Sequence, residues 1–124
     1  MPKQTVNFPN DPKSERAFLA AIMLEPKIYK QVDVTIDDFF DEKHKKIYQC
    51  ICELSEEGIG CDYVAVNAKV ESKGWGQQIE TSYIFSLGDE FPSAITREWK
   101  AYSTVIKKKS AARQLLALSQ KMSF

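Results

Sequence analysis

One short stretch of the chain, from Asp37 to Leu54, gathers the residue types that most often carry out chemistry in proteins. Its sequence, DDFFDEKHKKIYQCICEL, contains His44, the only histidine of the chain, together with Cys50 and Cys52. Thiolate and imidazole groups are common ligands of structural zinc, and a cysteine activated by a histidine is a common catalytic nucleophile. The stretch therefore raises two hypotheses, a zinc site and a cysteine-dependent active site.

The spacing of these residues argues against both hypotheses if the stretch is helical. Each residue of an α-helix turns by about 100° and rises by about 1.5 Å, so Cys50 and Cys52 point about 160° apart and His44 lies roughly 12 Å from Cys52 along the axis. Zinc needs its ligand atoms within about 2.3 Å of one point. Cys61 could approach Cys52, but two ligands are too few, and no cysteine has His44 within reach as a base. We interpret the cysteines as small buried hydrophobic residues.

The other polar residues of the stretch also have structural interpretations. Four carboxylates stand where the helix should begin: Asp37, Asp38, Asp41 and Glu42. Carboxylates at that position cap backbone N–H groups and suit the helix dipole. We expect His44 to be structural, with its ring packed near Phe39 or Phe40 and one nitrogen bonded to the backbone. Because the glycines form no phosphate-binding loop either, the sequence predicts no catalytic residue, no cofactor and no metal.

The composition is typical of one globular domain in a reducing cytoplasm. Hydrophobic residues make up 44% of the 124 residues, and the longest apolar run, Ala17 to Leu24, is too short to span a membrane. Three cysteines and no export signal argue against a disulfide framework. The net charge of zero conceals a division, because residues 1–96 carry ten basic against sixteen acidic residues and residues 97–124 carry seven against one. Such a division suggests a binding partner.

Helix signals run along almost the whole chain and predict an all-α fold of about five to six helices. Asp11 and Pro12 can open a first helix that Pro26 stops, and its many apolar positions predict burial on most sides. The remaining expected elements are a turn at 26–32, a helix at 42–57 ended by Gly58, a helix between Asp62 and Gly74, a short apolar segment at 82–87, a loop at 88–93 and one continuous helix from 94 to about 121. We expect the aromatic pair Phe39 and Phe40 to need a core.

The last predicted helix suggests how the protein works. Its first half can pack on the body, but Leu115, Leu116 and Leu118 lie beyond what a domain of this size easily covers. Exposed leucines on a protruding helix usually contact another helix, from a later segment or from a second copy. The basic run at 107–113 could instead grip phosphates, although aromatic residues that would stack on single strands are missing beside it.

Five motifs, in order along residues 9–124, resemble the N-terminal domain of the DnaB-type replicative DNA helicases. Phe39, Phe40, His44, Ile47 and Tyr48 match the pattern D-F-[FY]-x-x-x-H-x-x-I-[FY]. The other motifs are the opening helix in PNDPKSERAFLAAIMLEP, the turn in EEGIGCDYVAV, the tyrosine-containing segment SYIFSL and the run FPSAITREWKAYSTVIKKKSAARQLL. The order and spacing of these motifs make the resemblance specific.

The resemblance implies a flexible arm at residues 1–8, a helical head at residues 9–96 and a long basic helix at residues 97–124. That helix would begin a hairpin leading to a motor domain outside this sequence. In the family, heads and hairpins pair and form a collar on a hexameric ring, which binds the helicase-binding domain of primase and helps loading. The expected partners are therefore further copies, primase and a helicase loader, while ATP hydrolysis and most DNA contact would belong to the motor.

We expect self-association to involve the last helix. The candidate residues are Tyr102, Ile106, Leu115, Leu116 and Leu118, with Arg113 positioning the helix. Two alternatives stay open: the helicase-binding domain of a primase, which has a similar helical fold, and a small nucleic-acid-binding module with a basic helix.

Overall fold

The computed structural model describes residues 8–121, and every regular element within them is helical. The elements are α1 (Pro12–Leu24), η1 (Pro26–Gln31), η2 (Ile36–Asp38), α2 (Glu42–Glu56), α3 (Tyr63–Ser72), α4 (Thr81–Glu90), η3 (Ser93–Arg97) and α5 (Trp99–Lys121), where η denotes a short 3₁₀ helix. The prediction of an all-α fold is confirmed. The predicted arm at residues 1–8 lies outside the described residues except for Phe8.

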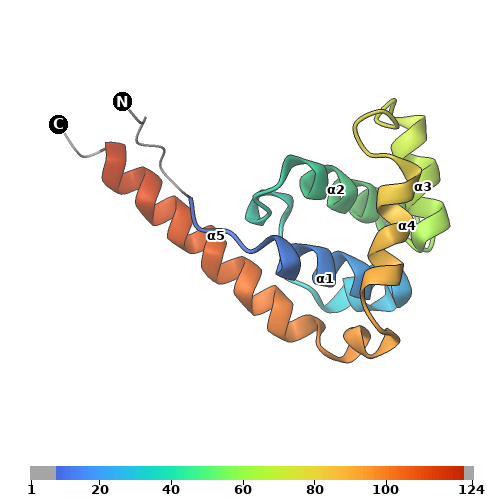
Figure 1. The fold of residues 1–124 in the computed structure, drawn as a ribbon, viewed down its shortest axis with the longest axis horizontal. Coiled ribbons are helices and arrows are strands. Elements are labelled where there is room, and N and C mark those ends of the chain that lie inside the picture. The colour runs from blue at the N-terminus through green and yellow to red at the C-terminus, as the bar shows by residue number, and fades with distance from the viewer. Residues whose placement is uncertain (1–7, 122–124) are drawn as a thin grey trace.

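Helix α1 lies at the centre of the fold. The carboxylate of Asp11 accepts a hydrogen bond from the backbone N–H of Ser14 at 3.1 Å, and Pro12 opens the helix, as the sequence predicts. All residues from Ala17 to Met23 are at most 1% exposed, because α1 is packed on several sides by other helices. Figure 1 shows α5 on one side of α1 and α3 with α4 on the other.

Three aromatic rings, one of them from α1 itself, pack together in the core. Phe18 lies 6.1 Å from both Phe39 and Tyr48, measured between ring centroids, and Phe39 lies 5.0 Å from Tyr48. The Tyr48 hydroxyl donates a 2.7 Å hydrogen bond to the carbonyl of Val34, so this buried polar group is satisfied. Phe40, in contrast, is exposed, and the expectation that it needs a core is wrong.

Local capping sets the ends of α2 and α3, as predicted. Asp41 accepts a hydrogen bond from the N–H of Lys43 at 2.8 Å, and Asp62 accepts one from the N–H of Ala65 at 2.9 Å. Gly58 and Gly74 follow the two helices with φ of 77°, a left-handed conformation that favours glycine.

Two predicted boundaries are wrong. The expected loop at 88–93 is partly helical, because α4 continues through Gly88 to Glu90. Gly88 allows the Tyr63 ring to approach, since a Cβ there would lie 3.0 Å from its Cζ atom. The expected continuous helix at 94–121 is divided into η3 and α5, with Glu98 between them outside helical geometry. The buried side chain of Ile95 holds η3 against α1.

Helix α5 packs on the head with its first half. Its buried residues Ser103, Ile106 and Ser110 are spaced one turn apart, and the two serines are small enough to allow close approach. The helix then runs on past α1 toward the C-terminal end in Figure 1. Among residues 8–121, no helix combines the length and the apolar character that crossing a membrane requires.

Candidate protein-interaction surface

The outward side of α5 carries a stripe of exposed residues that no other described element covers. The stripe consists of Thr104, Lys108, Ala111, Leu115 and Leu118, which recur at helical spacing. Leu115 is 69% exposed and Leu118 is 53% exposed. We call these five residues the α5 stripe. Its leucines are large apolar side chains exposed to solvent, as expected for residues that bind another protein.

The six residues predicted for self-association do not share one environment. Ile106 is buried in the core, and the half-buried Tyr102 packs against it. Leu116 is half-buried, whereas Leu115 and Leu118 are exposed. Ile106 and Tyr102 therefore serve the contact between α5 and its own head. Of the six, only Leu115 and Leu118 are exposed.

The carboxylate of Asp38 ties α5 to the head. It accepts hydrogen bonds from the Ser110 hydroxyl at 2.8 Å and from the Thr35 backbone N–H at 2.8 Å, and Lys107 lies 3.4 Å away. Burial alone would raise the pKa of Asp38, but the hydrogen bonds from Thr35 and Ser110 and the charge of Lys107 outweigh it and hold the pKa below its ordinary value. The ionised carboxylate is thus the form that the contact favours.

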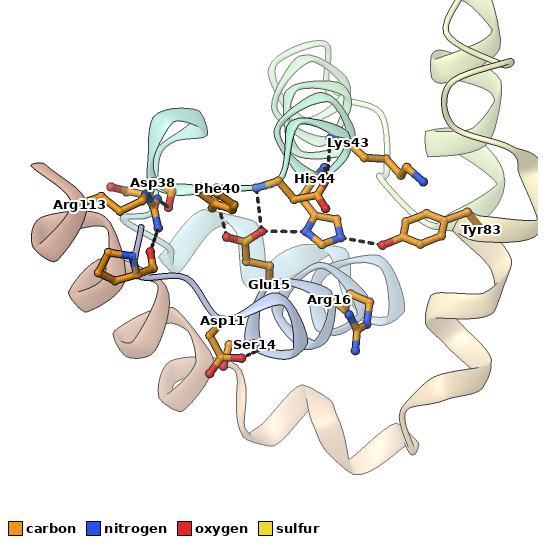
Figure 2. Close-up of polar contacts among 12 residues, drawn as sticks. Asp11, Ser14, Glu15, Arg16, Asp38, Phe40, Lys43, His44, Tyr83 and Arg113 are labelled. Carbon is orange, nitrogen blue, oxygen red and sulfur yellow. Dashed lines mark hydrogen bonds and ion pairs between the residues drawn. The ribbon is translucent and has the colours of Figure 1, made fainter. Parts of the chain in front are cut away.

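Arg113 adds a second tie on the same side of α5. Its guanidinium donates to the carbonyl of Asp38 at 2.6 Å and to the carbonyl of Pro9 at 2.8 Å, and it lies 5.4 Å from the centre of the Phe40 ring. Figure 2 shows Arg113 reaching from α5 toward Asp38 and Phe40. Together with Asp38, Arg113 fixes the direction in which α5 leaves the head. The partners of Asp38 and Arg113 could not be predicted from the sequence, because they come together only in the tertiary structure. One signal was available: Ser103 and Ser110 are small residues seven positions apart, as expected on a helix side that packs closely.

A buried chain of polar groups joins α1, α2 and α4. The Nδ1 atom of His44 lies 2.8 Å from Oε1 of Glu15, and the Nε2 atom lies 2.7 Å from the hydroxyl of Tyr83. The carboxylate of Glu15 also accepts hydrogen bonds from the N–H groups of Phe40 at 2.7 Å and Asp41 at 3.4 Å. Because an ionised carboxylate only accepts, Nδ1 donates to Glu15, and Nε2 is left to share a hydrogen bond with the hydroxyl of Tyr83. Figure 2 shows the three side chains in line.

The contacts with Glu15 and Tyr83 differ from the predicted environment of His44. The ring stacks beside Tyr83, with centroids 6.1 Å apart, and both nitrogens contact side chains, so the expected bond to the backbone is wrong. The structural role itself fits, because His44 and Glu15 are almost fully buried. Burial also raises the pKa of Tyr83 to about 12. The local pattern did not single out Glu15, because Lys13 and Arg16 are charged residues in the same turn of α1.

The cysteines lack the features of a catalytic nucleophile. Cys50 is buried, and burial raises the pKa of its thiol to about 11, so the thiol stays protonated at neutral pH. Burial also raises the pKa of the thiols of Cys52 and Cys61, which line an open groove of about 860 Å³ beside η1. Within residues 8–121, no three histidine, cysteine or acidic side chains are grouped to hold a metal ion.

The all-helical fold and the exposed α5 stripe are typical of a domain that binds other proteins. Comparison with known proteins identifies its family. Residues 7–108 match the family described as the DnaB-like helicase N terminal domain, which is most of the chain. The chain therefore belongs to the DnaB-like helicase N-terminal domain family.

Individual relatives give the same result. The chain is 27% identical over 111 residues to the replicative DNA helicase DnaC of Bacillus subtilis (strain 168), and 28% identical over 111 residues to the replicative DNA helicase DnaB of Geobacillus stearothermophilus. Each alignment covers 87% of this chain but only 24% of the relative, so the chain spans about a quarter of their length.

Among solved structures, the N-terminal domain of DnaB helicase from Mycobacterium tuberculosis has the same fold. The two structures superpose with a TM-score of 0.86 at 22% sequence identity, over 93% of this chain and 83% of the other. The chain thus corresponds to the N-terminal domain of a replicative helicase.

Proposed function

We propose that this domain is a non-catalytic assembly and docking module of a replicative DNA helicase. In this role it joins copies of the helicase into a collar and offers a docking surface for primase or a helicase loader. The observation that carries the proposal is the exposure of Leu115 and Leu118 on a helix whose direction is fixed by Asp38 and Arg113. A rigid, apolar helix face suits contact with another helix.

The rival proposals are less well supported. The family match over residues 7–108 favours the helicase side of the contact over the helicase-binding domain of a primase. A basic-helix nucleic-acid binder would use the cations of α5, and two of them have structural partners, because Lys107 contacts Asp38 and Arg113 is bonded to two backbone carbonyls. These two cations serve the contact between α5 and the head.

The proposal is tested by sedimentation velocity over a hundredfold range of concentration. The unaltered chain should show a sedimentation coefficient that rises with concentration. Leu115→Asp should remain monomeric, because a carboxylate replaces an apolar side chain at the contact and is costly to bury there. Since Leu115 is exposed, the variant should keep its helical circular-dichroism spectrum and melting temperature.

Gln77→Asp, an equal change of charge at an exposed turn residue, is the matched control and should associate as the unaltered chain does. A chain that stays monomeric throughout, or a Leu115→Asp variant that associates normally, would contradict the proposed assembly role.

A further inference from the structure

We propose that Cys52 and Cys61 form a site of reversible oxidation, in which a disulfide joins α2 to the loop before α3. The oxidant is a small-molecule disulfide, for which oxidised glutathione is the example. Both thiols are free in the structure, and both line the groove beside η1. This modification site is separate from the α5 stripe and does not depend on self-association.

The sulfur of Cys61 lies against the turn of α2 that contains Cys52. The hydroxyl of Ser55 donates a weak hydrogen bond to Sγ of Cys61 at 3.8 Å. Ser55 follows Cys52 by three residues, and residues three apart are neighbours on one side of an α-helix, with Cβ atoms about 5–6 Å apart. Both thiols therefore face the same part of the groove.

The groups that act on the Cys52 thiol agree with this proximity. Burial is the main cause that raises the pKa of Cys52, and the hydroxyl of Tyr29 opposes it. The charges of Glu56 and of a Cys61 thiolate raise the pKa further, as expected for groups that lie close to Cys52. Since a raised pKa makes thiolates scarce at neutral pH, the pair should react slowly with an oxidant.

The loop between α2 and α3 can supply the movement that a disulfide requires. A disulfide holds its two Cβ atoms about 3.5–4.5 Å apart. Gly58 and Gly60 lie in this loop, and at neither position would an added Cβ have a neighbour within 4 Å. Ile59 between them is 51% exposed. Because little packs against the loop, Cys61 can approach Cys52 without displacing the core.

Cys50 is unsuited to the same reaction. It precedes Cys52 by two residues, so the two side chains point about 160° apart on α2. Cys50 is fully buried, and it is not among the described residues that line the groove. Cys52, in contrast, is only half-buried and can be reached by a small oxidant from the groove. Cys50 therefore serves as an internal control.

The reaction consists of two thiol–disulfide exchanges. The Cys52 thiolate attacks one sulfur of oxidised glutathione, whose S–S bond breaks, and one glutathione leaves as a thiolate that takes up a proton. The Cys61 thiolate then attacks Sγ of Cys52, which forms the internal S–S bond and releases the second glutathione. The two cysteines lose two electrons and two protons in total, and one glutathione disulfide becomes two glutathione thiols.

The bridge changes the groove and the connection between two helices. It lies between residues that line the groove, and it ties the second half of α2 to the loop before α3. An excess of reduced glutathione removes it, because thiol–disulfide exchange runs in both directions. The state of the pair thus depends on the ratio of glutathione disulfide to glutathione thiol.

The test is treatment of the folded chain with oxidised glutathione, alkylation of the remaining thiols with iodoacetamide in urea, and intact-mass spectrometry. The unaltered chain should lose two hydrogen atoms and take up one alkyl group, at Cys50. Cys50→Ala should lose two hydrogen atoms and take up none. Reduced glutathione should restore both thiols. The bridged Cys50→Ala chain should melt at a higher temperature than its reduced form, because a cross-link constrains the unfolded chain.

Cys52→Ala and Cys61→Ala are the matched variants. Cys61→Ala should stop at the mixed disulfide, with one glutathione on Cys52, whereas Cys52→Ala should stay unmodified because Cys61 is buried. Three free thiols after treatment, a bridge that is lost in Cys50→Ala, or a bridge that forms only in urea would overturn the inference. Disulfides formed only between two chains, or a bridged form that melts below its reduced form, would also overturn it. The sedimentation experiment on Leu115→Asp tests the proposed function separately.

Discussion

The imidazole of His44 is held by residues that are remote from it in the sequence. Glu15 lies 29 residues before it and Tyr83 lies 39 residues after it. The spacing along one helix was enough to predict that His44 and the cysteines do not share a metal ion. It could not identify partners on α1 and α4, because those contacts arise only when three helices pack. The sequence therefore indicates a structural histidine but not its hydrogen bonds.

Substitution of His44 by alanine should destabilise the fold strongly. The change leaves the buried carboxylate of Glu15 without one of its donors and opens a cavity, which together should lower the free energy of unfolding by about 2–4 kcal/mol. Urea denaturation followed by circular dichroism measures the effect. Lys45→Ala, which removes only a surface pair with Glu42, should cost less than about 0.5 kcal/mol. Equal stabilities of the two variants would contradict the buried polar chain.

At the scale of helices, the accuracy of prediction depends on what sets each boundary. Asp11, Asp62 and Gly74 act on their own helix ends, so their residue types reveal those ends. Gly88 lies instead within α4 where the Tyr63 ring approaches closely, and Ile95 of η3 is buried against other parts of the fold. Such tertiary causes leave no local pattern in the sequence.

The contact between η2 and α5 should weaken in acid. The pKa of Asp38 is lower in the folded protein than in the unfolded chain, so its contribution is fully present above the unfolded value and is lost as the pH falls below about 4. Asp38→Asn should be less stable than the unaltered chain at neutral pH, and the difference should shrink in acid. Urea denaturation at several pH values measures it, with the exposed Asp37→Asn as control. A difference that is independent of pH would contradict the role of the Asp38 charge.

At the scale of the whole molecule, the basic and acidic parts of the sequence are also separated in space. The basic helix α5 and the helices α3 and α4, which belong to the acidic part of the chain, lie on opposite sides of α1, as Figure 1 shows. The sequence predicted that the distal leucines lie beyond what a domain of this size easily covers, and Leu115 and Leu118 are exposed while Leu116 is half-buried. It could not separate Tyr102 and Ile106, which contact the head, from Leu115 and Leu118, since all four lie on one amphipathic helix.

The central claim is that the domain works by self-association through α5, and a concentration series of ¹H–¹⁵N NMR spectra tests it most directly. On raising the concentration, amide shifts should change along the α5 stripe, at Leu115 and Leu118 above all. The amides around the buried Glu15 and His44 should stay constant. Shifts that do not depend on concentration, or that change only around the groove beside η1, would contradict the account.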